Sequence, residues 1–213
     1  MPLRNRVDPS GEIRAVAARG LFTGNRGVIH DPETRTLLGR RWTTKAWIIC
    51  DCGYKARKRD VFGRNARSGG PGWTNLFFLD EPTALAAGHR PCFECRRGPA
   101  LAFAACFGSA IGQARSLAAR IDAQLHAERA ASGDTPATIG RRDVPKLPGG
   151  AIVLHDGRFL ARKGEGLRAW SFHGYGAAID LSALAPGDIR VMTPPSTLAA
   201  LAAGYRPTWH PTA

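Results

Sequence analysis

The sequence contains no long apolar run: no stretch reaches 18 consecutive apolar residues, about the length that a membrane-spanning helix needs. The first twenty residues alternate charged and small side chains and lack the apolar centre of a secretory signal. We therefore expect a cytoplasmic protein with no membrane partner. In that reducing compartment the five cysteines are expected to be thiols, so closely spaced pairs indicate a metal rather than disulfides.

Acidic residues are scarce. The chain has 17 Asp and Glu against 30 Lys and Arg, a formal net charge of +13. Such a field attracts polyanions, so DNA is the first partner to consider, with RNA left open. The alternative is a basic composition with no role in nucleic-acid binding. Hydrophobic residues make up 44% of the chain, which is enough to bury a core and excludes the disordered class.

Four of the five cysteines form two closely spaced pairs. One pair has a single intervening residue and ends a predicted strand, and the other is a C-x-x-C pair that follows an Arg-Pro turn. Two pairs of thiolates suit tetrahedral zinc, although unliganded buried cysteines are the alternative. Cys106, in an Ala-rich segment, is expected to pack in the core. The sequence predicts one structural zinc ion held by Cys50, Cys52, Cys92 and Cys95.

Three short segments recur later in the chain in the same order: residues 28–31 at 153–156, 46–54 at 169–175 and 85–91 at 201–207. Ordered recurrence indicates an internal repeat. We expect an α+β fold with two copies of a small unit of β-hairpin, strand and short helix, the first copy stabilised by zinc. The expected organisation is a zinc-binding unit with a basic loop (1–98), a connecting helix (99–132) and a degenerate second copy without cysteine ligands (133–213). The oligomeric state stays open, and a monomer fits the duplication.

Local signals define the short helix of each copy and the connector. In the first copy a strand over 76–79 leads to Asp80, a predicted N-cap, and Gly88 is predicted to end the helix. Residues 99–132 carry apolar side chains at spacings of three and four, which predicts one long helix between the copies.

The segment from Leu76 to Arg96 has a short helix, a Gly-His-Arg-Pro turn and the C-x-x-C pair. It resembles the end of the Ada-type zinc-binding domain of methylation DNA-repair proteins, and the resemblance covers about residues 47–97. It implies four thiolates on zinc and a scaffold that presents basic residues to DNA. By position it makes Cys50 a candidate acceptor of a methyl group from a DNA phosphotriester. Here the first cysteine pair is spaced more closely, and the insert between the pairs is longer, than in that family.

Basic residues gather before, between and after the cysteine pairs, and a Gly-rich stretch over 68–72 lies within the insert. Folding at zinc is expected to bring these groups to one side, where about six to ten phosphate contacts would make binding steeply salt-dependent. A solvated basic face is the alternative. The predicted DNA-contacting residues are Arg40, Arg41, Lys45, Lys55, Arg57, Lys58, Arg59, Arg64, Arg67, Arg96 and Arg97.

Four further side chains are candidates for catalysis. On the predicted long helix Asp122 and His126 share a polar face, and Glu128 falls near the apolar stripe. His30 lies in a predicted strand. An enzyme built on them would be a metal-dependent DNA endonuclease that uses Mg²⁺ or Mn²⁺. The sequence favours a zinc-containing DNA-binding protein of DNA repair or processing, with the nuclease and a protein-interaction module for an acidic partner as alternatives.

Overall fold

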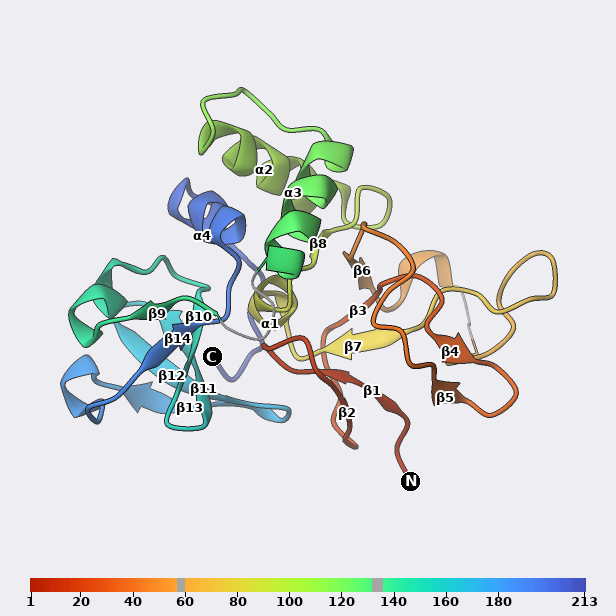
Figure 1. Ribbon diagram of the computed structural model, residues 1–213, viewed down its shortest axis with the longest axis horizontal. Coiled ribbons are helices and arrows are strands. Elements are labelled where there is room, and N and C mark those ends of the chain that lie inside the picture. Colours follow the sequence, from red (N-terminus) through yellow and green to blue (C-terminus); the bar gives the residue numbers. More distant parts are fainter. Residues whose placement is uncertain (57–59, 132–135) are drawn as a thin grey trace.

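The computed structural model of the chain describes residues 1–56, 60–131 and 136–213. These residues form an α+β fold with 14 strands, four α-helices and three short 3-10 helices, which confirms the predicted class. Two sheets lie on either side of the molecule, and the α-helices gather between and above them (Figure 1). Within the described ranges no helix is both long and apolar enough to cross a membrane.

The first sheet has the strand order β2-β1-β7-β3-β6-β8. β3 pairs antiparallel with both β6 and β7, and the β1–β7 and β6–β8 pairs are parallel. Because β6 and β8 are parallel, their C-terminal ends lie at the same edge of the first sheet. The two cysteine pairs lie at or just after these strand ends. The strands are β1 (Arg4–Val7), β2 (Ile13–Ala15), β3 (Phe22–Asn25), β6 (Ile48–Asp51), β7 (Leu76–Phe78) and β8 (Arg90–Pro91).

The remaining strands form a second six-stranded sheet and a small hairpin. The second sheet is antiparallel, with the order β13-β12-β11-β10-β14-β9. Its strands are β9 (Thr138–Ile139), β10 (Ile152–His155), β11 (Arg158–Lys163), β12 (Gly166–Ser171), β13 (Gly174–Ile179) and β14 (Ile189–Val191). The hairpin consists of β4 (His30–Asp31) and β5 (Thr36–Leu37).

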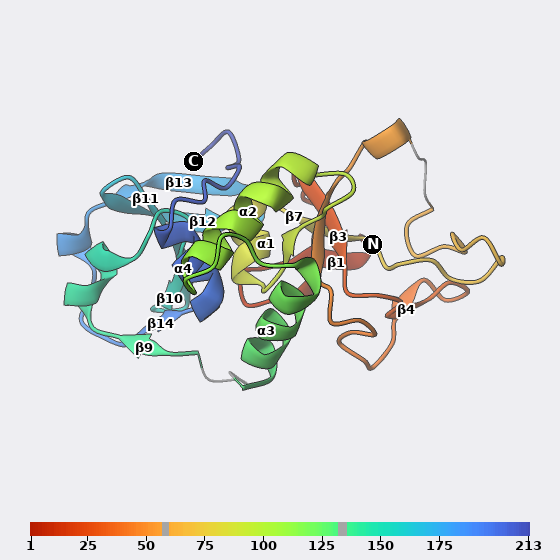
Figure 2. The same ribbon diagram turned by 90° about the horizontal axis from the view of Figure 1, so that it is seen from above.

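The helices pack where the two halves meet. α1 lies between the sheets, and α2, α3 and α4 stand beside one another in both ribbon views (Figures 1 and 2). The α-helices are α1 (Glu81–Ala86), α2 (Arg97–Ser109), α3 (Ala118–Ala131) and α4 (Pro195–Ala202). The 3-10 helices are η1 (Tyr54–Ala56), η2 (Arg141–Lys146) and η3 (Leu181–Ala183).

Helix α1 begins and ends where the sequence predicts. The Asp80 carboxylate accepts hydrogen bonds from the backbone N–H of Thr83 at 3.1 Å and from its hydroxyl at 2.7 Å, so Asp80 is the N-cap. Gly88 follows the helix with φ +78°, a conformation that favours glycine.

The predicted single helix over 99–132 is wrong for the described part of that range, which forms two helices. α2 ends at Ser109, and the chain turns back before α3 begins at Ala118. Gly108 allows the return, because a Cβ there would lie 2.7 Å from the Cα of Arg115. Phe103 on α2 and Leu125 on α3 are both buried in one cluster. The apolar spacing is therefore satisfied by two helices that face the same core.

The structure does not confirm the predicted duplication of a whole unit. Residues 30 and 31 form β4, which pairs with β5 in the separate hairpin, whereas their sequence echo lies at the end of β10, which pairs with β11 and β14 in the second sheet. The recurring part is smaller. A strand leads into a short helix that ends at a glycine with positive φ, Gly88 or Gly204. At the residue after each glycine, the His89 N–H reaches back to the Ala84 carbonyl and the Tyr205 N–H reaches back to that of Ala200.

The hydrophobic core crosses between the predicted copies. Leu201 and Tyr205, from the predicted second copy, belong to the same buried cluster as Leu85 from the predicted first copy. A second cluster joins Leu79 to Ile152. A backbone hydrogen bond also joins the two parts of the chain: the Glu81 N–H donates to the Thr208 carbonyl at 3.1 Å. The two halves are therefore stabilised by shared packing.

Candidate metal centre

Three cysteines meet at the edge of the first sheet. Cys50 lies in β6, and Cys92 follows β8 directly, with its N–H donating to the Ile49 carbonyl at 2.9 Å. The turn after Cys92 brings Cys95 back, and the Arg96 N–H closes it on the Cys92 carbonyl at 3.0 Å. The sulfur atoms of Cys50, Cys92 and Cys95 all lie within 4.8 Å of one another. Zn–S bonds of about 2.3 Å place tetrahedral sulfurs about 3.8 Å apart, so this cluster fits zinc with small side-chain adjustments.

The cluster favours a thiolate even without metal. A hydrogen bond with Cys50 lowers the pKa of Cys92 to about 5, and the Glu94 N–H, 3.4 Å from the Cys92 sulfur, also lowers it. The hydrogen bonds with Cys92 and then Cys95, together with burial, raise the pKa of Cys50. Because thiolate is the form that binds metals, the lowered pKa of Cys92 suits a metal ligand.

The structure does not bring Cys52 into this cluster. Its side chain is exposed, and its sulfur contacts the Leu21 carbonyl oxygen at 3.5 Å. β6 ends at Asp51, so Cys52 belongs to the turn that leaves the sheet. Three of the four predicted ligands therefore meet, and the fourth lies apart. Cys106 on α2 is half-buried against the first core, as predicted.

A pocket of about 230 Å³ opens beside the three sulfurs. Asn25 from β3, and Trp73 and Thr74 from the segment before β7, line it together with the cysteines. These three residues are uncharged and come from segments far apart in the chain, and the acidic Asp51 and Glu94 also line the pocket. The sequence did not predict their place beside the cysteines, because only the pairing of β3 with β6 and β7 brings them there.

One predicted DNA-contacting residue is buried. Arg96 is 5% exposed, and its guanidinium bonds both carboxylate oxygens of Glu81, at 2.8 and 3.1 Å. It also lies 3.4 Å from Asp51. The prediction that Arg96 contacts DNA is therefore wrong, because its charge is used inside the protein.

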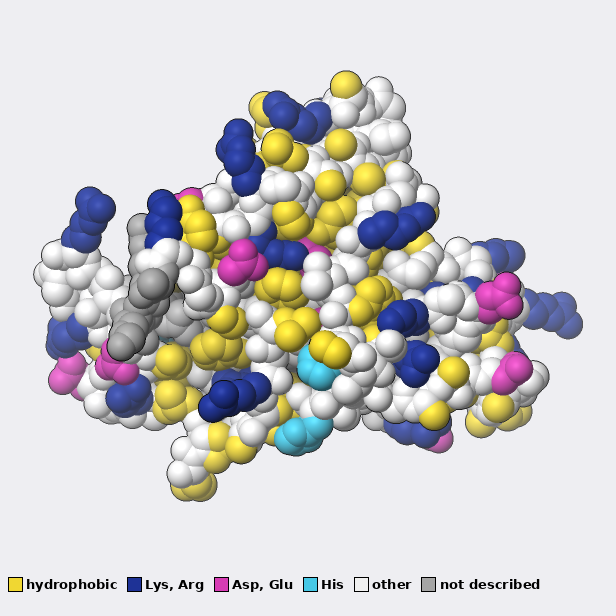
Figure 3. Space-filling model, turned by 180° about the vertical axis from the view of Figure 1, so that it is seen from behind, with side chains coloured by type: hydrophobic (Ala, Val, Ile, Leu, Met, Phe, Trp, Pro, Cys, Tyr) yellow, Lys and Arg dark blue, Asp and Glu magenta, His cyan; other side chains and the backbone are white. Residues whose placement is uncertain are grey.

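Most of the other predicted basic residues are exposed. Among them Lys55 pairs with Glu94 at 3.7 Å, which places it beside the cysteine turn. Arg64 pairs with Glu33 at 2.7 Å. Figure 3 shows lysine and arginine side chains spread over one face, with acidic ones among them. Arg57, Lys58 and Arg59 lie outside the described residues. The exposed set is Arg40, Arg41, Lys45, Lys55, Arg64, Arg67 and Arg97.

The candidate catalytic carboxylates on α3 have structural partners. Asp122 accepts two hydrogen bonds from Arg90, at 2.8 and 2.7 Å, which hold α3 against β8. Glu128 accepts from the backbone N–H of Ser196 at 3.2 Å and from its hydroxyl, which holds α3 against the start of α4. Both are engaged in joining elements of the fold.

The candidate histidines are also placed by packing. His30 is buried, its Nδ1 lies 2.7 Å from the Thr74 hydroxyl, and its ring stacks on Phe62. His126 packs edge-on against Trp42, with ring centres 4.7 Å apart. In the parts of the chain that the structure describes, the cysteine cluster is the one group of His, Cys, Asp and Glu side chains close enough to share a metal ion.

Comparisons with protein-family models, with curated proteins and with solved structures gave no match to this chain.

Proposed function

We propose that the protein binds one structural zinc ion through Cys50, Cys92 and Cys95, with the fourth position of the tetrahedral site filled by another ligand. The observation that carries the proposal is the approach of the three sulfurs to within 4.8 Å of one another. Zinc would tie the end of β6 to the turn between β8 and α2. The half-buried position and the lowered pKa of Cys92 support a thiolate site.

We further propose that the basic surface around this centre binds the phosphate backbone of DNA, in a protein of DNA repair or processing. The net charge of +13 and the exposed arginines and lysines before and after the cysteines support it. Arginine suits phosphate because its planar fork donates two parallel hydrogen bonds. The described basic residues are spread out and belong to different elements, which favours contacts to the backbone over reading of bases.

Phosphodiester hydrolysis is not part of the proposal. Asp122 is held by Arg90 and joins α3 to β8, and Glu128 is held by Ser196 and joins α3 to α4. An acidic protein partner would use the same basic surface, so it becomes an outcome of the test.

The test uses the purified full chain. Elemental analysis should find one zinc per chain, and absence of zinc after expression in zinc-supplemented medium would refute the metal site. Fluorescence anisotropy with labelled duplex DNA and with RNA should then show binding that weakens by about 10³- to 10⁵-fold between 50 and 200 mM salt. Zinc without any DNA binding near 100 mM salt would refute the DNA role alone and direct attention to an acidic protein.

A further inference from the structure

A second and larger cavity, of about 420 Å³, lies between the two halves of the molecule. Its walls come from α1 and α3 on one side and from β14, the start of α4 and the loop around Leu147 on the other. Much of the lining is apolar and includes Leu147, Val191 and Leu198. This volume is in the range of sites that bind small organic molecules.

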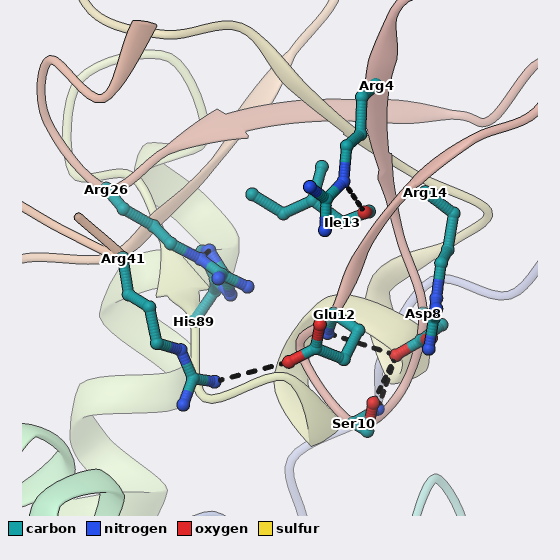
Figure 4. Close-up of polar contacts among 9 residues, drawn as sticks. All are labelled: Arg4, Asp8, Ser10, Glu12, Ile13, Arg14, Arg26, Arg41 and His89. Carbon is teal, nitrogen blue, oxygen red and sulfur yellow. Dashed lines mark hydrogen bonds and ion pairs between the residues drawn. The ribbon is translucent and has the colours of Figure 1, made fainter. Parts of the chain in front are cut away.

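One wall of this cavity concentrates positive charge. Trp47 lines the cavity, and its ring lies between two guanidinium groups, those of Arg26 at 4.0 Å and Arg129 at 4.2 Å. Arg129 and Arg41 line the cavity themselves. Figure 4 shows Arg26 and Arg41 extending side by side, Arg26 to His89 and Arg41 toward Glu12. Two cationic side chains thus lie over one indole, and Arg41 adds a third positive charge to the lining of the cavity.

Acidic side chains balance this charge poorly. Arg26 is 1% exposed, and burial, followed by the charges of Arg41 and Arg129, lowers its pKa to about 9. Burial likewise lowers the pKa of Arg129 to about 10. Glu12 approaches Arg41 only to 4.0 Å. Glu128 also lines the cavity, but its oxygens accept hydrogen bonds from Ser196.

Several donors around the same wall have no partner among the described residues: Arg26 Nη2, Trp47 Nε1 and Arg129 Nε. A buried donor left unpaired costs about 1–3 kcal/mol, so three together require an explanation. Arg26 Nη2 lies 3.4 Å from the position that a Cβ on Gly11 would take, and Gly11 lines the cavity. Gly11 therefore adds no side chain of its own beside this buried donor.

We propose that this cavity binds a small organic anion, a phosphate or carboxylate group carried on an aromatic or apolar body. The anionic group would meet Arg41, where a charge-assisted hydrogen bond can form. It would also be attracted by the charge of Arg129, whose Nη atoms already donate to the Gly88 and Lys45 carbonyls at 2.6 and 2.8 Å. The body would lie against Trp42, Val191 and Leu198. The site is separate from the cysteine cluster, so zinc binding and anion binding are tested independently.

The first experiment measures binding to the zinc-loaded full chain by isothermal titration calorimetry, with phenyl phosphate, benzoate, inorganic phosphate and the neutral benzyl alcohol as probes. Phenyl phosphate or benzoate should bind at least about tenfold tighter than inorganic phosphate and benzyl alcohol. Only phenyl phosphate and benzoate combine an anionic group with an aromatic ring. The stronger of the two identifies the anionic group. Equal affinity for benzyl alcohol, equal affinity for inorganic phosphate, or no binding at millimolar probe would overturn the proposal.

The second experiment locates the site. Ala130 is exposed on α3 and lines the cavity, so Ala130→Trp should fill the cavity and abolish probe binding without unfolding the protein. Arg41→Gln should weaken probe binding about tenfold, since it removes one charged donor at the rim. Arg120→Gln is the matched control, because Arg120 is an exposed arginine on α3. This variant should bind the probes like the original protein. Unchanged binding in Ala130→Trp, with its fold verified by circular dichroism, would place the probes elsewhere and refute the site.

Discussion

Arg96 and Glu81 form a buried two-pronged ion pair, with Nη1–Oε1 at 2.8 Å and Nη2–Oε2 at 3.1 Å. Glu81 also accepts hydrogen bonds from the Tyr205 hydroxyl at 2.6 Å and the Thr208 N–H at 2.8 Å. Arg96 follows Cys95 directly. A single carboxylate therefore connects the cysteine turn, the first turn of α1 and the C-terminal segment.

We expect Glu81→Gln to lower the free energy of unfolding by about 3–5 kcal/mol, because it removes the buried carboxylate partner of Arg96 and leaves only the part-exposed Asp51 beside it. Urea denaturation followed by circular dichroism measures the change. Glu33→Gln breaks the exposed pair with Arg64 and serves as the control, with almost no effect expected. Similar stability of the two variants would contradict the role assigned to Glu81.

Neighbouring arginines should behave differently. Arg97 is exposed, so Arg97→Gln should leave stability unchanged, weaken DNA binding and reduce the slope of log affinity against log salt by about one. Arg96→Gln should destabilise the fold by about 3–5 kcal/mol, because Glu81 then loses its charged partner. Anisotropy titrations and urea denaturation of both variants check this. Equal loss of DNA affinity in two folded variants would restore Arg96 to the DNA surface.

The cysteines should separate into two groups. Cys92→Ser should lose bound zinc, because it removes one of the three converging sulfurs, whereas Cys52→Ser should keep it. Elemental analysis of dialysed protein reports the stoichiometry, with Cys106→Ser as a thiol-removal control. Loss of zinc in Cys52→Ser would show that Cys52 turns inward as a fourth ligand when metal binds.

Loss of zinc should also disturb the second half of the chain. The shared clusters that join Phe103 to Tyr205, and Leu79 to Ile152, link the halves, so they should unfold in one transition. NMR signals of the Trp47 and Trp170 indoles in Cys92→Ser should broaden or shift together on titration with urea. Retention of native Trp170 signals after those of Trp47 are lost would show that the halves unfold separately.

Stability should fall on acidification because of His89. This side chain is fully buried, and its Nε2 lies 3.4 Å from Arg26 Nε. Burial, and then the charges of Arg26 and Arg129, hold the pKa of His89 well below its usual value of 6.5. Below pH 6.5 the unfolded chain therefore binds a proton at His89 that the native state does not bind. The free energy of unfolding should drop by up to about 1.4 kcal/mol per pH unit.

Urea denaturation between pH 7.5 and 5.5 measures this dependence. His89→Gln should remove about one proton from the slope, whereas His173→Gln, at an exposed position, should leave it unchanged. An unaltered slope in a folded His89→Gln protein would refute the assignment.

The sequence predicted structural features that depend on residues close together along the chain. Asp80 caps α1 and Gly88 ends it because capping and positive φ depend on local chemistry. The α+β class follows from similar signals. The single long helix was wrong because apolar spacing does not reveal where a chain folds back, which here depends on close packing of Gly108 against Arg115.

By itself the sequence determined the excess of positive charge, the paired cysteines and the ends of α1, since these are properties of composition and short segments. Tertiary structure alone decided that three of the four paired cysteines converge, because the parallel pairing of β6 with β8 sets which sulfurs meet. It also buried Arg96 against Glu81 and surrounded Trp47 with Arg26 and Arg129. The residues in each of these contacts are not neighbours in the sequence, so only folding brings them together. Whether an arginine is buried in an ion pair or exposed on the surface therefore depends on tertiary structure.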